Sequence, residues 1–352
     1  MNSLDSQYLY IMQDILTKGS LSDDRTGTGT KKGFGYQISH NMSEGFPLLT
    51  SKTISTQNII SELLWFLKGD TNIRTLCLQN NFIWVGDAYK KYEKDWMTEN
   101  PPFSGPYDKK LTYLEFFSEI RNNPTFANKW GELGPIYGKQ WRNWSGIKVN
   151  HDQVKTLVQS LKTNPDSRRL LVSAWNVDDL DKMTLPPCHV LFQCFTRKLT
   201  FLEKWNLLEP LYDKRKGFDG ALAEDVKNEE DLNSVYPEFS LPEREISLSW
   251  YQRSVDVPLG LPYNIASYGF LLEILAAESN MIAGKLVGNF GDTHIYLNQV
   301  DGCVKQLSRI NDIPDLPKLK LHKEDKIEDY CMADFELIDY NPLPFIKFPL
   351  SN

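Results

Sequence analysis

The apolar stretch 264–280, NIASYGFLLEILAAESN, places the tightest limit on the fold. It is typical of a helix that is buried among other elements, because few polar residues interrupt it. Three apolar or alternating runs, 170–175, 189–195 and 246–252, are typical of buried or half-buried strands. Strands mixed with long helices predict an α+β domain.

The remaining periodic segments extend this pattern over one large domain, residues 1–352. We expect helices over 6–17, within 54–72 and over 152–163, and a strand over 34–40. Two excursions are less regular, near 86–130 and 203–244, and we interpret both as surface insertions. The Pro-rich end, 341–352, is too short for a core of its own, so it must pack on the domain or stay loose.

Charge and composition exclude several classes of protein. The net charge is −7 without a basic block, which argues against a groove for DNA, whereas a single nucleotide needs only a few arginines. No apolar run approaches the roughly 18 residues of a membrane span, and the polar start lacks the pattern of a secretory signal. The five cysteines show no CxxC spacing, so we expect no metal and a cytoplasmic location.

The stretch LPPCHVLFQCF, residues 185–195, contains two of those cysteines. Cys188 is either a nucleophile or a small apolar residue that fills a strand, and the local sequence alone favours the second interpretation. Four arginines flanked by turns or hydroxyls, with Ser254 beside the last of them, have two interpretations. They form either a phosphate cradle or surface ion pairs. They are Arg25, Arg168, Arg169 and Arg253.

Other candidate residues are equally ambiguous one by one. His294 and Tyr296 share a face if they lie on a strand, where they bind a sugar hydroxyl or only each other. Glu62, inside SELLWFL, is exposed or is buried with a raised pKa. Asn264 opens the apolar helix, where it is an N-cap or an amide that recognises a base edge.

Taken together and in order, seven strings resemble the folate-dependent thymidylate synthases. The strings are RTGTGT, FPLLTSKT, ELLWFLKGDTNI, LGPIYGKQWRNW, PDSRRLLVSAWNVDDLDKMTLPPCH, YQRSVDVPLGLPYNIASYGFLL and GDTHIY. The resemblance runs from Arg25 to the last residues and fails only at the two excursions. It implies one mixed β-sheet packed by helices, with a sheet face that forms a homodimer interface.

The resemblance also implies a reaction. Cys188 matches a nucleophile that adds to C6 of the uracil ring of dUMP. C5 then attacks the methylene of the cosubstrate 5,10-methylenetetrahydrofolate, which also supplies a hydride and leaves as dihydrofolate, while dUMP becomes dTMP. Arg25, Arg253 and Ser254 match phosphate ligands of the same subunit. Arg168 and Arg169 match ligands that the neighbouring subunit supplies.

The same comparison assigns the remaining site residues. Asn264 matches the residue that recognises uracil, and His294 and Tyr296 match the ribose ligands. Glu62 matches a proton relay, and Tyr137 matches a residue near the C5 proton. His189 matches a residue that shapes the water network. Asp256 matches a residue that contacts the pterin and also takes part in catalysis and dUMP binding. An apolar wall for the folate is matched by Ile83, Trp84, Leu259, Gly260 and Tyr263.

Three departures keep alternatives open. The chain ends in FPLSN rather than in an apolar residue, Asp87 stands where a second Trp is common, and TIST follows TSK where basic residues are common. Because closure excludes water from a reactive methylene, a dUMP hydroxymethylase is the first alternative. An inactive scaffold that binds a nucleotide or RNA is the second.

Overall fold

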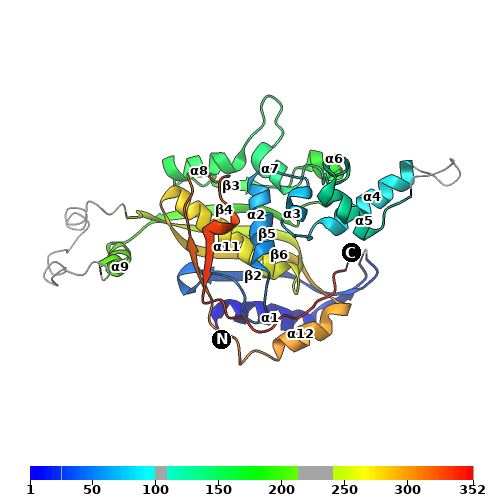
Figure 1. Cartoon of the computed structure of the whole chain (residues 1–352). Helices are drawn as coiled ribbons and strands as arrows, with labels where there is room; N and C mark the ends of the chain where they lie inside the picture. The colour runs from blue at the N-terminus through cyan, green and yellow to red at the C-terminus, as the bar shows by residue number, and fades with distance from the viewer. Residues whose placement is uncertain (25, 100–108, 213–240, 352) are drawn as a thin grey trace.

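A six-stranded mixed sheet forms the centre of the molecule in the computed structural model, which describes residues 1–24, 26–99, 109–212 and 241–351 (Figure 1). The strand order is β1-β2-β6-β5-β4-β3, and β5–β6 is its parallel pair. A second, two-stranded sheet pairs β7 with β8. The strands are β1 Ser20–Ser22, β2 Thr30–Asn41, β3 Leu171–Ser173, β4 His189–Lys198, β5 Arg244–Asp256, β6 Ile282–Tyr296, β7 Lys318–Leu321 and β8 Phe335–Ile338.

Helices pack on this sheet, which confirms the predicted α+β class. They are α1 Ser3–Lys18, α2 Thr56–Leu67, α3 Arg74–Leu78, α4 Val85–Glu99, α5 Tyr113–Asn122, α6 Pro124–Trp130, α7 Tyr137–Asn143, α8 Gln153–Thr163, α9 Phe201–Tyr212, α11 Gly260–Ser279 and α12 Val300–Leu307. A short 3-10 helix, η4 Leu297–Gln299, follows β6. Among the described residues, no helix is long and apolar enough to cross a membrane.

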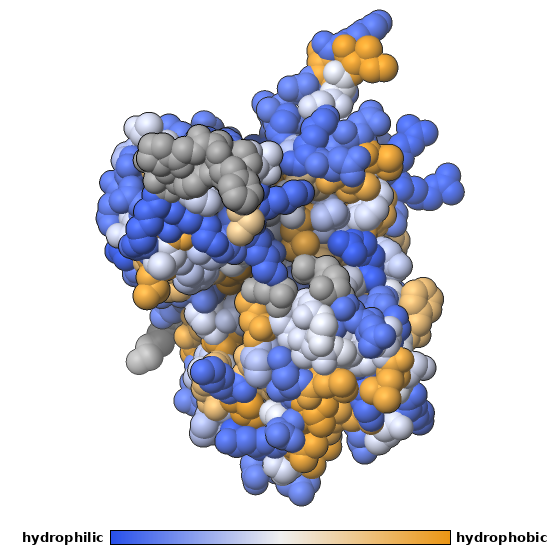
Figure 2. All heavy atoms as spheres, turned by 90° about the vertical axis from the view of Figure 1, so that its right-hand side faces the viewer, coloured by the Kyte–Doolittle hydropathy of each residue, from blue (hydrophilic) through white to orange (hydrophobic). Residues whose placement is uncertain are grey.

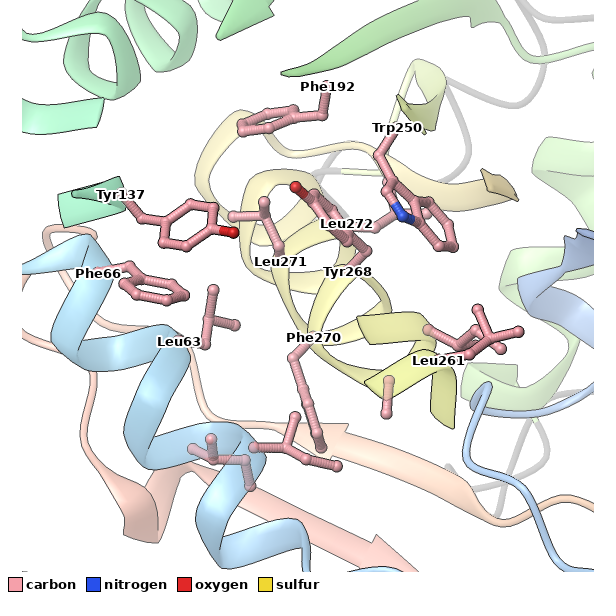
Figure 3. Packing of buried hydrophobic residues seen from close by; sticks show 14 of the residues in the cluster. Leu63, Phe66, Tyr137, Phe192, Trp250, Leu261, Tyr268, Phe270, Leu271 and Leu272 are labelled. Carbon is pink, nitrogen blue, oxygen red and sulfur yellow. The ribbon is translucent and has the colours of Figure 1, made fainter. Parts of the chain in front are cut away.

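Helix α11 is the crossover between the parallel strands β5 and β6, a connection that two-residue turns cannot make. It packs against both strands and against α2 and α8, as expected for a helix with so few polar residues. Figure 3 shows its Tyr268, Phe270 and Leu271 pointing into the core. The ring of Tyr268 stacks on Trp250 of β5 at 4.8 Å.

The helix begins four residues earlier than Asn264. Its first residue is Gly260, so the interpretation of Asn264 as an N-cap is wrong. Pro262 fits in the first turn because the N–H that it lacks would have no partner there. Asn264 therefore lies in the second turn, where it caps nothing and its amide is available for other contacts.

The outer face of the sheet is exposed and carries both polar and apolar side chains. Phe195 on β4 is 64% exposed on this face. A hollow on this face is lined by residues of β2, β4, β5 and β6, Gln193 among them.

The first excursion, 86–130, has an aromatic core of its own between α4, α5 and α6. The ring centroid of Tyr92 lies 5.1 Å from that of Phe116 and 5.0 Å from that of Trp130. The string LTYLEFFSEIRNN, residues 111–123, predicts a short helix, which α5 confirms, whereas α4 and α6 were not predicted. Figure 2 shows the side of the molecule on which this excursion projects, a mainly hydrophilic surface with separate apolar patches.

The second excursion, 203–244, begins inside α9, a helix that the sequence did not predict. Its residues 213–240 lie outside the described residues. That both excursions are insertions in a single domain stays a prediction. The C-terminal segment, by contrast, packs on the domain, with Ile346 and Phe348 buried.

Candidate active site

Cys188 lies directly before β4 and is partly exposed. Its backbone N–H donates to the Tyr137 hydroxyl at 2.7 Å, and its carbonyl accepts from the Arg253 N–H at 2.8 Å. Contacts from α7 and β5 thus fix the backbone of this cysteine. Cys194, six residues on, is 2% exposed within β4, which confirms the core-filler interpretation for that residue.

Arg253 brings a positive charge to the turn before Cys188. Its Nε donates to the Pro187 carbonyl at 2.8 Å, and a terminal nitrogen donates to the Pro186 carbonyl at 2.9 Å. The guanidinium also lies 5.5 Å from the ring centroid of Trp175, a cation–π contact. Arg253 is therefore held at the Pro–Pro turn rather than in a surface ion pair.

Glu62 of α2 is buried, with 9% of its surface exposed. Its Oε1 accepts from the Trp84 indole N–H at 2.7 Å. Burial raises the pKa of Glu62 to about 7, although the Trp84 hydrogen bond opposes the rise. A carboxyl with this pKa can take up and release a proton near neutral pH.

Tyr137 and His189 form a stacked pair beside Cys188, with ring centroids 4.1 Å apart. Burial lowers the pKa of His189 to about 3, so the imidazole is neutral at neutral pH. Its Nδ1 lies 2.9 Å from the hydroxyl of Tyr268. Burial raises the pKa of Tyr137 well above 10, so it remains a phenol. Figure 3 shows the hydroxyl ends of Tyr137 and Tyr268 pointing toward one another.

Asn264 is oriented by Gln252, a buried residue of β5. The Gln252 Nε2 donates to Asn264 Oδ1 at 2.9 Å and to the Ser254 carbonyl at 3.1 Å. A methyl-sized group at Gly260 would lie 3.7 Å from Asn264 Oδ1 and 3.9 Å from the Cβ of Asp256. The side chains of Asn264 and Asp256 therefore both lie beside Gly260.

Asp256 and His294 are direct partners on the paired strands β5 and β6. The His294 Nδ1 lies 3.0 Å from an Asp292 carboxylate oxygen, and its ring is 5.3 Å from that of Tyr296. The predicted shared environment of His294 and Tyr296 at one strand end is therefore present. Their proposed contact with a sugar stays a prediction.

Both carboxylate oxygens of Asp256 have partners. Oδ1 accepts from the Leu259 N–H at 3.0 Å, and Oδ2 accepts from the Gln299 amide at 3.1 Å. Burial raises the pKa of Asp256, which those two hydrogen bonds and nearby Lys52 oppose. Buried Lys52 donates to the Pro258 carbonyl and lies 4.5 Å from the ring centroid of Phe348, and burial lowers its pKa to about 8.

The expected folate wall has a buried and an open part. Trp84 is buried, Leu259 and Tyr263 are half-buried, and Ile83 is exposed. Sequence reasoning missed Lys52, Gln252 and Gln299. Lys52 stands in the string FPLLTSKT and Gln252 in the string that begins YQRSVD, which were their signals, whereas Gln299 lies outside the seven strings. Within the described part of the chain, no group of three or more His, Cys, Asp or Glu side chains could hold a metal ion.

Arg168 and Arg169 do not join this cluster. Both are exposed, and their backbone contacts run to Gln193 and Ser167. Arg25 lies outside the described residues. The cluster thus combines a partly exposed thiol with a proton-exchanging carboxyl, a neutral imidazole, a cation and an oriented amide. Such a set suits covalent catalysis on a small polar ring.

Comparisons with known proteins agree on one family. The sequence model described as "Thymidylate synthase" matches residues 6–217 and 223–352. The thymidylate synthase of Staphylococcus haemolyticus is 39% identical over 363 residues, which cover 100% of this chain and 99% of that protein. That of Mycoplasma mobile is 39% identical over 342 residues, with 97% and 98% covered.

The raised pKa of Glu62 predicts a pH-dependent stability. Between pH 4.5 and 7 the folded chain binds more protons at this site than the unfolded chain, so its contribution to stability falls as the pH rises. Relative to Glu62→Gln, the wild type should lose about 2.5 kcal/mol of unfolding free energy from pH 5 to pH 8. Denaturant titrations at both pH values measure this loss.

Exposed Glu44 supplies the matched control for that experiment. Glu44→Gln should leave the wild-type pH dependence unchanged. Equal pH dependence in wild type and Glu62→Gln would contradict the buried, proton-holding state of Glu62.

Proposed function

The chain belongs to the thymidylate synthase family and is an enzyme that methylates dUMP, and we propose that it does so through a covalent bond from Cys188 Sγ to C6 of the uracil ring. The cosubstrate is 5,10-methylenetetrahydrofolate, which leaves as dihydrofolate. The observation that carries the proposal is the setting of Cys188. It is partly exposed, and Tyr137 and Arg253 hold its backbone while buried Glu62 and neutral His189 lie nearby.

In the proposed reaction, addition of the Cys188 thiolate to C6 makes C5 a nucleophile. C5 then forms a bond to the folate methylene, and the C–N bond of the folate breaks. Loss of the C5 proton and of the folate nitrogen leaves an exocyclic methylene, which accepts a hydride from tetrahydrofolate. The thiolate departs from C6 as dTMP forms, so that tetrahydrofolate is oxidised to dihydrofolate.

The site residues have distinct roles in this scheme. Glu62, with a pKa of about 7, relays a proton to and from the folate nitrogen. Tyr137 remains a phenol and orders water beside C5. His189, neutral and bonded to Tyr268, shapes the same water network without adding charge.

The nucleotide contacts follow from the polar groups on β5, α11 and β6. Asn264, oriented by Gln252, binds the uracil edge, because one amide both donates and accepts. Arg253 and Ser254, with Arg25, bind the phosphate. His294 and Tyr296 bind the ribose, and Asp256 lies between nucleotide and pterin. The folate lies against the apolar wall that contains Trp84 and Tyr263.

We further propose that the working form is a homodimer paired through the outer face of the sheet. The exposure of Phe195 supports this, since pairing through this face would bury its ring. Arg168 supports it too, because its carbonyl accepts from Gln193, which lines the hollow on that face. Arg168 and Arg169 would then reach the phosphate in the neighbouring subunit.

The two alternatives differ from this proposal in testable ways. A dUMP hydroxymethylase would use Cys188 and the same folate but finish with water, and the burial of Phe348 near Asp256 favours hydride instead. An inactive scaffold for a nucleotide or RNA has no need of a buried Glu62 that shares the neighbour Tyr137 with Cys188. The expected cytoplasmic location stays a prediction.

Product analysis separates the three functions. With dUMP and 5,10-methylenetetrahydrofolate, the enzyme should release dTMP and dihydrofolate in equal amounts, and Cys188→Ala should release neither. Mass spectrometry of the nucleotide and the absorbance of dihydrofolate provide the measurement. Hydroxymethyl-dUMP with tetrahydrofolate would contradict the hydride step, and binding without turnover would support the scaffold.

Mixed dimers test the shared sites. Arg169→Ala and Cys188→Ala should each be nearly inactive alone, because every site lacks one component. After subunit exchange at equal amounts, half of the dimers contain one complete site, so activity should return to about a quarter of wild type. As a control, Arg253→Ala mixed with Cys188→Ala should recover nothing, because both residues belong to one subunit's site. Absence of recovery in the first mixture would contradict the exchange of Arg169 between subunits.

A further inference from the structure

Gln299, in η4 directly after β6, is a fully buried residue with contacts to three parts of the site. Its Nε2 donates to Asp256 Oδ2 at 3.1 Å and to the Pro349 carbonyl at 3.1 Å. Its Oε1 accepts from the Tyr296 N–H at 3.0 Å. One amide thus joins the end of β5, the end of β6 and the C-terminal segment.

These partners allow the amide only one orientation. Two acceptors, a carboxylate and a carbonyl, face Nε2, and one donor faces Oε1. Rotation of the amide by half a turn would set its oxygen against two oxygens and its NH2 group against an N–H. Because the site is buried, each lost hydrogen bond would leave a polar group without water as a substitute.

The C-terminal segment has further anchors around Gln299. The Phe348 ring packs against Gly302, where a methyl group would lie 2.5 Å from a ring carbon, and against the Lys52 ammonium group. One residue beyond Leu350, Ser351 accepts a hydrogen bond from the Asn298 side chain at 3.1 Å. Of these anchors, Gln299 is the one that donates a hydrogen bond to Asp256, whereas Lys52 acts on that carboxylate through its charge.

We propose that Gln299 is a positioning residue that couples docking of the C-terminal segment to the orientation of the Asp256 carboxylate. The inference rests on the proposed function, in which Asp256 contacts the pterin. Release of the segment removes one acceptor from the amide and frees it to turn, so that Asp256 Oδ2 loses a fixed donor. By reciprocity, folate that holds Asp256 in place stabilises the docked segment.

The test compares two variants in a Cys188→Ala background, which binds substrates without turnover. Gln299→Glu keeps an acceptor for the Tyr296 N–H but sets an oxygen against Asp256 and Pro349. Asn298→Ala removes a tether of the segment without touching Asp256. In each protein, with dUMP present, folate affinity is measured by calorimetry. Release of C-terminal residues by carboxypeptidase, with and without folate, is measured by mass spectrometry.

In the parent protein, folate should slow release of the C-terminal residues at least tenfold. Gln299→Glu should bind folate at least tenfold more weakly, and folate should no longer slow release. Asn298→Ala should release the residues faster without folate yet keep both the folate affinity and the protection. Gln299→Met, which removes the hydrogen bonds without adding charge, should match Gln299→Glu and replaces it if that variant does not fold.

Two results would overturn the inference, and they are distinguishable. If the Gln299 variants bind folate normally and remain protected, Gln299 is a tether like Asn298 and couples nothing. If the parent protein binds no folate, the proposed function itself fails.

Discussion

The parallel pairing of β5 and β6, joined by α11, is the constraint on which the site depends. Parallel strands end at the same edge of a sheet, so Asp256 and His294 come together although 38 residues separate them. The crossover helix starts at that edge, which brings Asn264 beside Asp256. The neighbouring strand β4 runs antiparallel to β5 and begins there, so Cys188 and Arg253 share a backbone hydrogen bond. The parallel pairing of β5 and β6 therefore brings together the polar residues of the site, which are Cys188, Arg253, Asp256, Asn264 and His294.

Burial sets the charge state of the two ionisable residues on the apolar side of the site, Glu62 and His189. It favours the uncharged form of any ionisable group, and this one cause moves the pKa of Glu62 up and the pKa of His189 down. The result is a carboxyl that exchanges protons near neutral pH beside an imidazole that does not. Trp84 and Tyr137 supply the low-polarity surroundings. The Trp84 indole N–H also donates to Glu62, and the Tyr137 hydroxyl accepts from the Cys188 backbone N–H.

The strongly periodic elements could be predicted from the sequence. Helices α1, α2 and α8 and strands β4 and β5 have apolar residues at helical or alternating spacing, and they lie where expected. Helix α4 was not predicted because polar residues dominate it. Asn264 was wrongly placed at the start of α11 because Pro262 made the first turn of that helix look like a loop. Gln299 lies outside the seven strings. Lys52 and Gln252 lie inside them, but nothing local indicates their partners Pro258 and Asn264, which are distant in sequence. The roles of such residues follow from contacts in the folded structure and cannot be predicted from the neighbouring sequence.

The central claim is that Cys188 forms the covalent bond to the nucleotide. The most direct measurement is acid quenching during turnover, followed by mass spectrometry of the tryptic peptide that spans residues 183–197 and contains Cys188 and Cys194. We expect a peptide whose added mass equals dUMP plus the methylene and folate portion, with fragmentation that assigns it to Cys188. An adduct on Cys194, or dTMP formation without any adduct on this peptide, would contradict that claim.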